Sequence, residues 1–113
     1  METLATFNRQ RTFLRDHSPV VQTMELKASA ELELPAGAVL AGENGVAALA
    51  ADTVTAAKVI GILSGPVTLK ADEYTTCAVV LHGDAVLDEL TVASGADKAK
   101  IAAVLKTVGI FAY

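Results

Sequence analysis

The sequence predicts a small α+β, β-rich domain: a compact sheet or barrel-like body with one C-terminal helix and an extended N-terminal arm. Short apolar runs separated by Gly- and Pro-containing turns recur from Val20 onward, which is typical of β-strands. A helical repeat of apolar residues occurs near the end, between Ser94 and Gly109. Residues 1–19 follow neither pattern. A chain of 113 residues is long enough for one domain with its own hydrophobic core.

The first two strands are predicted within residues 20–34. From Val20 to Ala28, mostly apolar residues alternate with mostly polar ones, so a strand here has one apolar face. Leu32–Leu34 continues in the same style, and the turn sequence Pro-Ala-Gly follows at residues 35–37. We therefore expect both strands to end before this turn.

A hairpin is predicted next. Val39–Ala41 and Val46–Leu49 are short apolar runs, and the sequence Gly-Glu-Asn-Gly at residues 42–45 separates them. Its Asn-Gly pair favours a tight hairpin because both residues tolerate a positive φ. Residues 50–58 are compatible with a loop or with one weak helical turn.

Two further strands are predicted before the C-terminal third. Val59–Leu63 is an apolar run, and Gly61 within it indicates a close backbone approach or a bulge. Ser-Gly-Pro at residues 64–66 turns the chain into a short strand at Val67–Leu69. Residues 70–74 form a polar connection to the next strand.

The stretch from residue 77 to residue 113 is predicted to form the centre of the fold. Cys77–Leu81 is a buried strand, because it is apolar, rich in Val and too short for a helix. His-Gly-Asp at residues 82–84 interrupts it, and apolar residues resume at 85–87. This pattern favours a hairpin or a sharply bent strand.

A helix follows, with its start predicted at Ser94–Asp97, where a hydroxyl caps it and an acid lies in the first turn. Its apolar positions recur at helical spacing, so one side packs on a sheet. They are Ile101, Val104, Leu105 and Val108. Gly109 is suited to end the helix, and the apolar residues 110–113 are expected to dock on the sheet as a last strand.

Composition excludes several classes of partner. The net charge of −4 argues against nucleic acid, which is bound through basic surfaces. No apolar run approaches the roughly 20 residues that span a bilayer, and the N-terminus lacks the apolar core of a secretory signal, so we expect synthesis in the cytoplasm.

Hydrophobic residues make up 52% of the chain and aromatics only 4%, so the core is built from small side chains. Neighbouring subunits are expected to cover part of the Ala-rich surface.

Residues 1–19 are predicted to be a separate arm that binds a partner, and residues 20–113 the β-rich body. The arm carries three arginines against two acids, a net charge of +1, whereas the body carries six lysines against eleven acids, a net charge of −5. Arginine and phenylalanine are enriched at interfaces. A solvated tail is common at a terminus, but this segment is more apolar than such tails. The pattern leaves open whether the arm binds as a strand or as a short helix. The candidate binding residues are Leu4, Phe7, Arg9, Arg11, Phe13, Leu14 and Arg15.

The sequence predicts no catalytic site, no cofactor and no metal. Cys77 and His82 offer two ligands, whereas zinc sites use three or four from the protein. The single cysteine cannot form an internal disulfide. Asp84, Asp88 and Glu89 lie around a predicted turn, where acids usually form a solvated rim and not a catalytic pair. We therefore predict that the protein is not an enzyme.

Four short signatures follow one another in the body: LPAGAVL at residues 34–40, AKVIGIL at 57–63, AVVLHGDAV at 78–86, and VGIF at 108–111 after an Ala- and Lys-rich helix. In this order and spacing, residues 20–113 resemble the head decoration proteins of tailed phages, the lambda-type capsid cement family. The arm matches these proteins in kind.

The resemblance implies a structural virion protein. Proteins of this family form homotrimers at threefold and quasi-threefold positions on the outside of the expanded capsid. They hold neighbouring major capsid proteins together against packaged DNA. The arm of such a protein becomes ordered on the shell, often by adding a strand to a capsid element. The resemblance thus implies the major capsid protein and the chain itself as partners, and the exterior of the virion as the location.

Two other classes of function are compatible with the residues. A small-molecule-binding or enzymatic β-barrel would need a concave pocket with convergent polar groups. Another virion structural subunit, of the tail or connector, would form rings of different symmetry and would not bind expanded shells.

Overall fold

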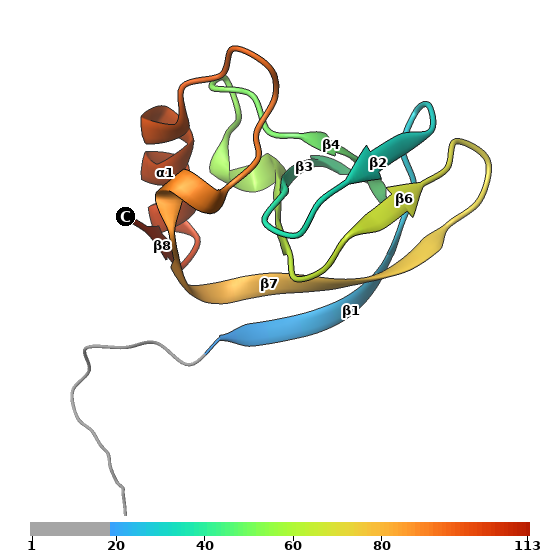
Figure 1. The fold of residues 1–113 in the computed structure, drawn as a ribbon, viewed down its shortest axis with the longest axis horizontal. Helices are drawn as coiled ribbons and strands as arrows, with labels where there is room; N and C mark the ends of the chain where they lie inside the picture. The colour runs from blue at the N-terminus through green and yellow to red at the C-terminus, as the bar shows by residue number, and fades with distance from the viewer. Residues whose placement is uncertain (1–18) are drawn as a thin grey trace, which may run out of the picture.

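The computed structural model describes residues 19–113. Within this range six strands form one sheet, in which β8 (Ile110–Ala112) pairs with β7 beside the main path. The main path runs through β1 (Val20–Leu26), β7 (Thr75–Ala85), β5 (Val59–Leu63), β3 (Val39–Glu43) and β4 (Val46–Leu49). All neighbours on this path are antiparallel, whereas β8 is parallel to β7. Figure 1 shows β1 beside β7 at the margin of the body, and α1 with β8 at the end opposite β2 and β6.

The sheet closes into a small barrel at one point. Lys27, directly after β1, forms a parallel bridge with Val46 of β4. The Lys27 backbone N–H donates to the Gly45 carbonyl at 2.9 Å, and the Ala47 N–H donates to the Lys27 carbonyl at 2.8 Å. The first and last strands of the path therefore meet, as a barrel requires. The predicted β-rich, barrel-like α+β fold is confirmed.

A second, two-stranded sheet covers one side of the barrel. Its strands are β2 (Leu32–Leu34) and β6 (Val67–Leu69), which pair antiparallel. Leu34 and Leu69 are buried against the barrel residues. Both strands were expected from their apolar runs, but only the folded chain brings together two segments so far apart in sequence.

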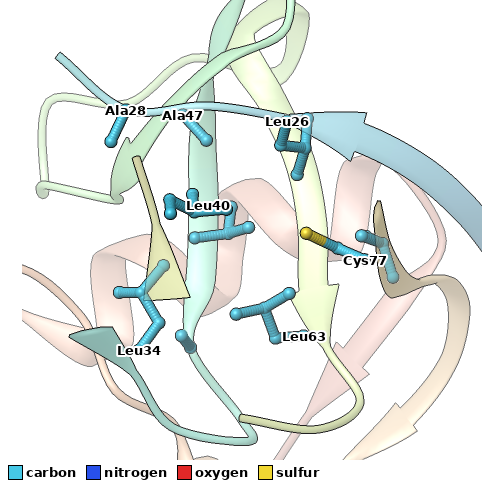
Figure 2. Packing of buried hydrophobic residues seen from close by; sticks show 10 residues of the cluster. Leu26, Ala28, Leu34, Leu40, Ala47, Leu63 and Cys77 are labelled. Atoms are coloured by element: carbon cyan, nitrogen blue, oxygen red, sulfur yellow. The ribbon is translucent and has the colours of Figure 1, made fainter. Parts of the chain in front are cut away.

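Ten buried side chains fill the barrel interior, and Leu40, Leu63, Leu69 and Val79 are the largest of those that are fully enclosed. Figure 2 shows Leu26, Leu40, Leu63 and Cys77 converging from different strands. The interior holds many Leu, Val and Ala residues and no aromatic ring among its buried members. The predicted core of small side chains is therefore present.

A second core layer lies between the outside of the barrel and helix α1 (Lys98–Thr107). The helix buries Ile101 and Leu105 in a cluster that includes Val39 and Ile62 of the sheet. Val39 and Ile62 directly precede the interior residues Leu40 and Leu63. Successive side chains of a strand point to opposite faces. In each of these two pairs, one residue therefore packs in the barrel interior and its neighbour packs under the helix.

Several local predictions are confirmed. Asn44 and Gly45 have φ of 57° and 79° at the β3–β4 turn, as the Asn-Gly signal predicts. A Cβ at Gly61 would lie 2.5 Å from a methyl group of Val79, so β5 approaches β7 closely at this residue. Gly109 has φ of 95° after the helix, and β8 docks on the sheet. Two short 3-10 helices, Ala56–Lys58 and Leu87–Glu89, are also present, and the first settles the ambiguous segment as one helical turn.

Two predictions at turns are corrected. Of the two alternatives at residues 82–84, a hairpin or a bent strand, the hairpin is wrong, because β7 continues as one strand through Gly83 to Ala85 and gains β8 as a partner there. The helix cap at Ser94 is also wrong. Asp97 is the capping residue, and its carboxylate accepts a hydrogen bond from the Ala99 N–H at 2.9 Å. The chain is still turning at Gly95, whose φ of 79° is not helical.

Candidate interaction surface

The seven candidate binding residues of the arm lie outside the described range, which begins at residue 19. They are Leu4, Phe7, Arg9, Arg11, Phe13, Leu14 and Arg15. The structure does describe the place where the arm joins the body, at Pro19 and the start of β1. This junction and its surroundings form the described part of the candidate site.

The junction is packed against β7. Gly83 is buried with a φ of 140°, and a Cβ added there would lie 3.2 Å from the Pro19 Cα. The Gly83 N–H donates to the Gly109 carbonyl at 3.1 Å, directly before β8. The arm therefore leaves the body beside the C-terminal strand. Glycine is suited to this position because it adopts the conformation without strain and leaves room for Pro19.

Strand β1 passes from the surface into the core. Val20 and Val21 are each 51% exposed, whereas Leu26 at the other end is 3% exposed and lies in the barrel interior. Gln22 and Thr23 are also exposed, and Met24 is half-buried. The expected apolar face of β1 is therefore covered only in its second half. Val20 of that face and Val21 of the opposite face both remain at the surface beside the arm.

The edge of β1 that faces away from β7 is open in the part of the chain described. The Lys27 backbone N–H and carbonyl point to β4 and not to β7. Backbone groups of alternate residues in a strand point to the same edge, and pairing with β7 is regular from Val21 to Leu26. The N–H and carbonyl groups of Val21, Thr23 and Glu25 therefore point to this outer edge. It is open at Val21 and Thr23, whereas the Glu25 carbonyl lies close to Gly45 of the β3–β4 turn. Among residues 19–113, β1 pairs with β7 on its other edge alone.

A groove lies beside this edge, between β1 and the β3–β4 turn, with a volume of about 420 Å³. Met24 and Ile60 contribute apolar side chains to its lining, and Glu25 and Glu43 contribute carboxylates. Lys58 forms an ion pair with Glu43. Glu25 is exposed and has no ion pair with another described residue. The groove thus combines an apolar lining with one unneutralised acid.

The side chains that could take part in catalysis or bind a metal do not gather in one place. His82 lies within β7 and not in a turn, and its ring packs edge-on against the Phe111 ring at 6.2 Å between centroids. Burial raises the pKa of the Cys77 thiol, which favours the protonated, unreactive form. Asp84, Asp88 and Glu89, three acids of the predicted rim, are exposed. Across residues 19–113, no three His, Cys, Asp or Glu side chains are grouped as a metal site would require.

Two other hollows lie near β6. One, of about 550 Å³, is lined by β2, β6 and the prolines that precede or follow them, Pro35 and Pro66. The other, of about 180 Å³, lies over Ser64–Val67 and the start of β7. Neither is lined by a histidine, and Glu33 is the one acid between them. In the described range, no helix has the length and apolar character of a membrane span.

No model of a known protein family matches the chain, and no curated protein matches it.

The open edge of β1 and its groove were not identified from the sequence. The alternation in residues 20–28 signals a strand, but a strand pattern is the same whether one edge or both are paired. The nearest signal was the position of this strand, directly after an arm rich in interface residues.

Proposed function

We propose that this protein is a structural virion protein that binds the outside of a tailed-phage capsid as a trimer and stabilises the expanded head. The observation that carries the proposal is the contrast between the two parts of the chain. The arm holds all three arginines and two of the three phenylalanines, and the body is acidic. A basic, aromatic segment attached to an acidic body is suited to bind a partner away from that body.

The contacts of the arm follow from its residue types. Phe7, Phe13 and Leu14 supply apolar anchors, which carry much of the energy at interfaces when buried. Arg9, Arg11 and Arg15 supply planar guanidinium groups that bind carboxylates through two parallel hydrogen bonds. The proposed partner surface on the major capsid protein is therefore acidic with apolar pockets.

The architecture of the body supports the proposal. The resemblance to the decoration proteins implies a small β-rich domain with one C-terminal helix, and the chain has this fold. The exposed valines at the start of β1 continue the apolar character of the arm onto the body. These valines would enlarge the apolar surface with which the arm contacts the shell.

A trimer would make a weak arm effective. When one arm is bound, the other two search a small volume at a high effective concentration, so binding of the assembly strengthens by roughly 10² to 10⁴ relative to one arm. No large contact of the folded body is then needed to hold the protein on the shell.

The test is co-sedimentation with expanded, undecorated phage heads, comparing the full-length chain with the 20–113 truncation. We expect the full-length protein to saturate near one trimer per threefold position, and the truncated protein to stay folded and remain in the supernatant. Absence of binding by the full-length protein would overturn the proposal and return attention to the barrel and tail-subunit alternatives.

A matched pair of substitutions tests the anchors. Phe13→Ala is expected to weaken shell binding more than Asp16→Ala, because a buried aromatic side chain contributes more than a charge at the rim of an interface. Equal losses in a binding titration would contradict the role of Phe13 as an anchor.

A further inference from the structure

We infer that in the free protein the arm binds in the groove between β1 and the β3–β4 turn of its own body, and that this contact competes with the shell for the arm. Arg11 pairs with Glu25 there, and Phe13 covers the apolar lining formed by Met24 and Ile60. The competition with the shell rests on the proposed function, whereas the contact within the chain does not.

The groove has an apolar lining that the body covers only in part. Met24 and Ile60 are half-buried and pack against the barrel interior. An apolar side chain placed over them would extend the barrel core outward, and the openings of β-barrels are frequent binding sites. A phenylalanine ring suits such a lining, because it buries about 150–250 Å² when it is enclosed.

The carboxylates of the groove favour a basic occupant. Glu25 is exposed and forms no ion pair with another residue of the range 19–113, whereas Glu43 is paired with Lys58. The Lys27 ammonium, two residues from Glu25, lies over the Tyr74 ring at 4.8 Å. The arm has a net charge of +1 and the body one of −5, so the two parts attract each other.

The arm has a residue pattern that matches this groove. Its basic and aromatic residues occupy every second position between residues 7 and 15. They are Phe7, Arg9, Arg11, Phe13 and Arg15. In an extended segment, side chains at every second position lie on one face, about 7 Å apart. One face of the arm then presents a ring with a guanidinium group on each side, which fits an apolar lining bordered by carboxylates.

The length of the arm sets which residues reach the groove. Met24 and Glu25 are five and six residues after Pro19, or about 17–20 Å along β1. Phe13 and Arg11 are six and eight residues before Pro19, and an extended chain of these lengths spans up to about 20–22 Å and 26–29 Å. Pro19 follows a serine, and a Ser-Pro pair favours a turn. An arm that turns back at Pro19 therefore places Phe13 beside Met24 and Arg11 beside Glu25.

The first test is a charge exchange in the free, full-length protein, followed through the amide chemical shifts of Gly45 and Ile60 at the groove. Arg11→Glu is expected to shift both amides, because the arm leaves the groove, and about 1 M salt should act in the same direction by screening the ion pair. In a Glu25→Arg background, Arg11→Glu restores an ion pair and should shift the amides in the opposite direction. Glu33→Arg is the matched control background, since Glu33 is exposed, has no ion pair with another described residue and lines a different hollow. There Arg11→Glu should act as it does in wild type.

The same variants distinguish the chain's own body from a neighbouring copy. In an equimolar mixture of the Arg11→Glu and Glu25→Arg proteins, no chain can pair its arm with its own groove. We expect the mixture to keep the chemical shifts of the two separate variants. Wild-type shifts in the mixture would assign the contact to a second copy and overturn the inference. Groove shifts that Arg11→Glu leaves unchanged in every background would also overturn it.

Shell binding measures the competition. A tethered arm searches its own body at a millimolar effective concentration, so a weak groove contact is enough to hold it for much of the time. We expect Glu25→Arg to bind expanded heads at least about twofold more tightly than Glu33→Arg, which has the same net charge, because an occupied arm lowers the apparent affinity for the shell. Equal binding by the two variants would overturn the competition and leave the proposed function intact. Failure of the wild-type protein to bind would overturn the proposed function, and the chemical shifts would still decide the contact within the chain.

Discussion

The two ends of strand β1 have similar residues and different surroundings. Leu26 is enclosed in the barrel, whereas Val20 and Val21, equally apolar, are half exposed beside the arm. The barrel end of β1 is covered because Lys27 bridges to β4 and other strands wrap around it. The arm end has β7 as its neighbour and nothing described on its outer edge. Burial in this protein is thus decided by which strands surround a residue, and not by the alternating pattern that the two ends share.

The difference has an energetic consequence. Full burial of a valine or leucine side chain stabilises a protein by about 1.5–3 kcal/mol. Each half-exposed valine at the arm end therefore retains roughly 1 kcal/mol that a partner could still realise by covering it. The barrel end of β1 therefore contributes more to folding than the arm end does.

The largest effect is expected from a substitution in the barrel interior. Leu40→Ala removes a fully buried side chain and should lower the free energy of unfolding by about 2–5 kcal/mol, because a cavity is left behind. The matched substitution at the arm end, Val21→Ala, should cost less than about 1 kcal/mol. Urea denaturation of both variants would measure this difference. Similar losses would show that the arm end is already packed in solution, and the comparison between the two ends would fail.

A second substitution tests whether the arm end of β1 is packed against β7 although its valines are exposed. Gly83→Ala should cost about 1–3 kcal/mol, because the residue has a φ of 140° and strained backbone conformations carry penalties of this size. The added methyl group would also approach the Pro19 Cα at 3.2 Å. Gly65→Ala is the control, since it meets nothing within 4 Å and has no positive φ. Its stability should stay within about 1 kcal/mol of wild type. If Gly83→Ala were as stable as Gly65→Ala, the junction with Pro19 would not be held as described.

The smallest expected effect comes from substitutions at the start of helix α1. Asp97→Ala removes the carboxylate that accepts from the Ala99 N–H and should cost about 1 kcal/mol. Ser94→Ala should change stability by less than about 0.5 kcal/mol, because Ser94 is exposed and is not the cap. Thermal unfolding of the two variants distinguishes them. A larger loss for Ser94→Ala would restore the sequence-based assignment of the cap.

Much of the fold was predictable because its signals are local. The Asn44-Gly45 turn, the close approach at Gly61 and the end of the helix at Gly109 each depend on the conformation that one or two residues adopt. The errors fell where a local signal had a distant competitor. Gly83 looks like a strand break, but β8, nearly thirty residues later in the chain, supplies hydrogen bonds that keep β7 extended.

The candidate site likewise has one part that the sequence predicts and one part that only the fold reveals. The composition of the arm marked seven candidate binding residues, which stay predictions because they lie outside the described range. The open edge of β1 could not be predicted, because it depends on where β7, β5, β3 and β4 close the barrel and where they leave it open.

By itself, the sequence determined the approximate positions of most strands and of the helix, the tight hairpin, and the contrast in charge between arm and body. These properties depend on residues within a few positions of one another, through alternation, turn conformations and composition. Only the tertiary structure decided the pairing of β2 with β6, the closure at Lys27, and the exposure of Val20 and Val21. Pairing joins residues that are distant in the chain, and a strand's own sequence does not encode which of its edges remains without a partner.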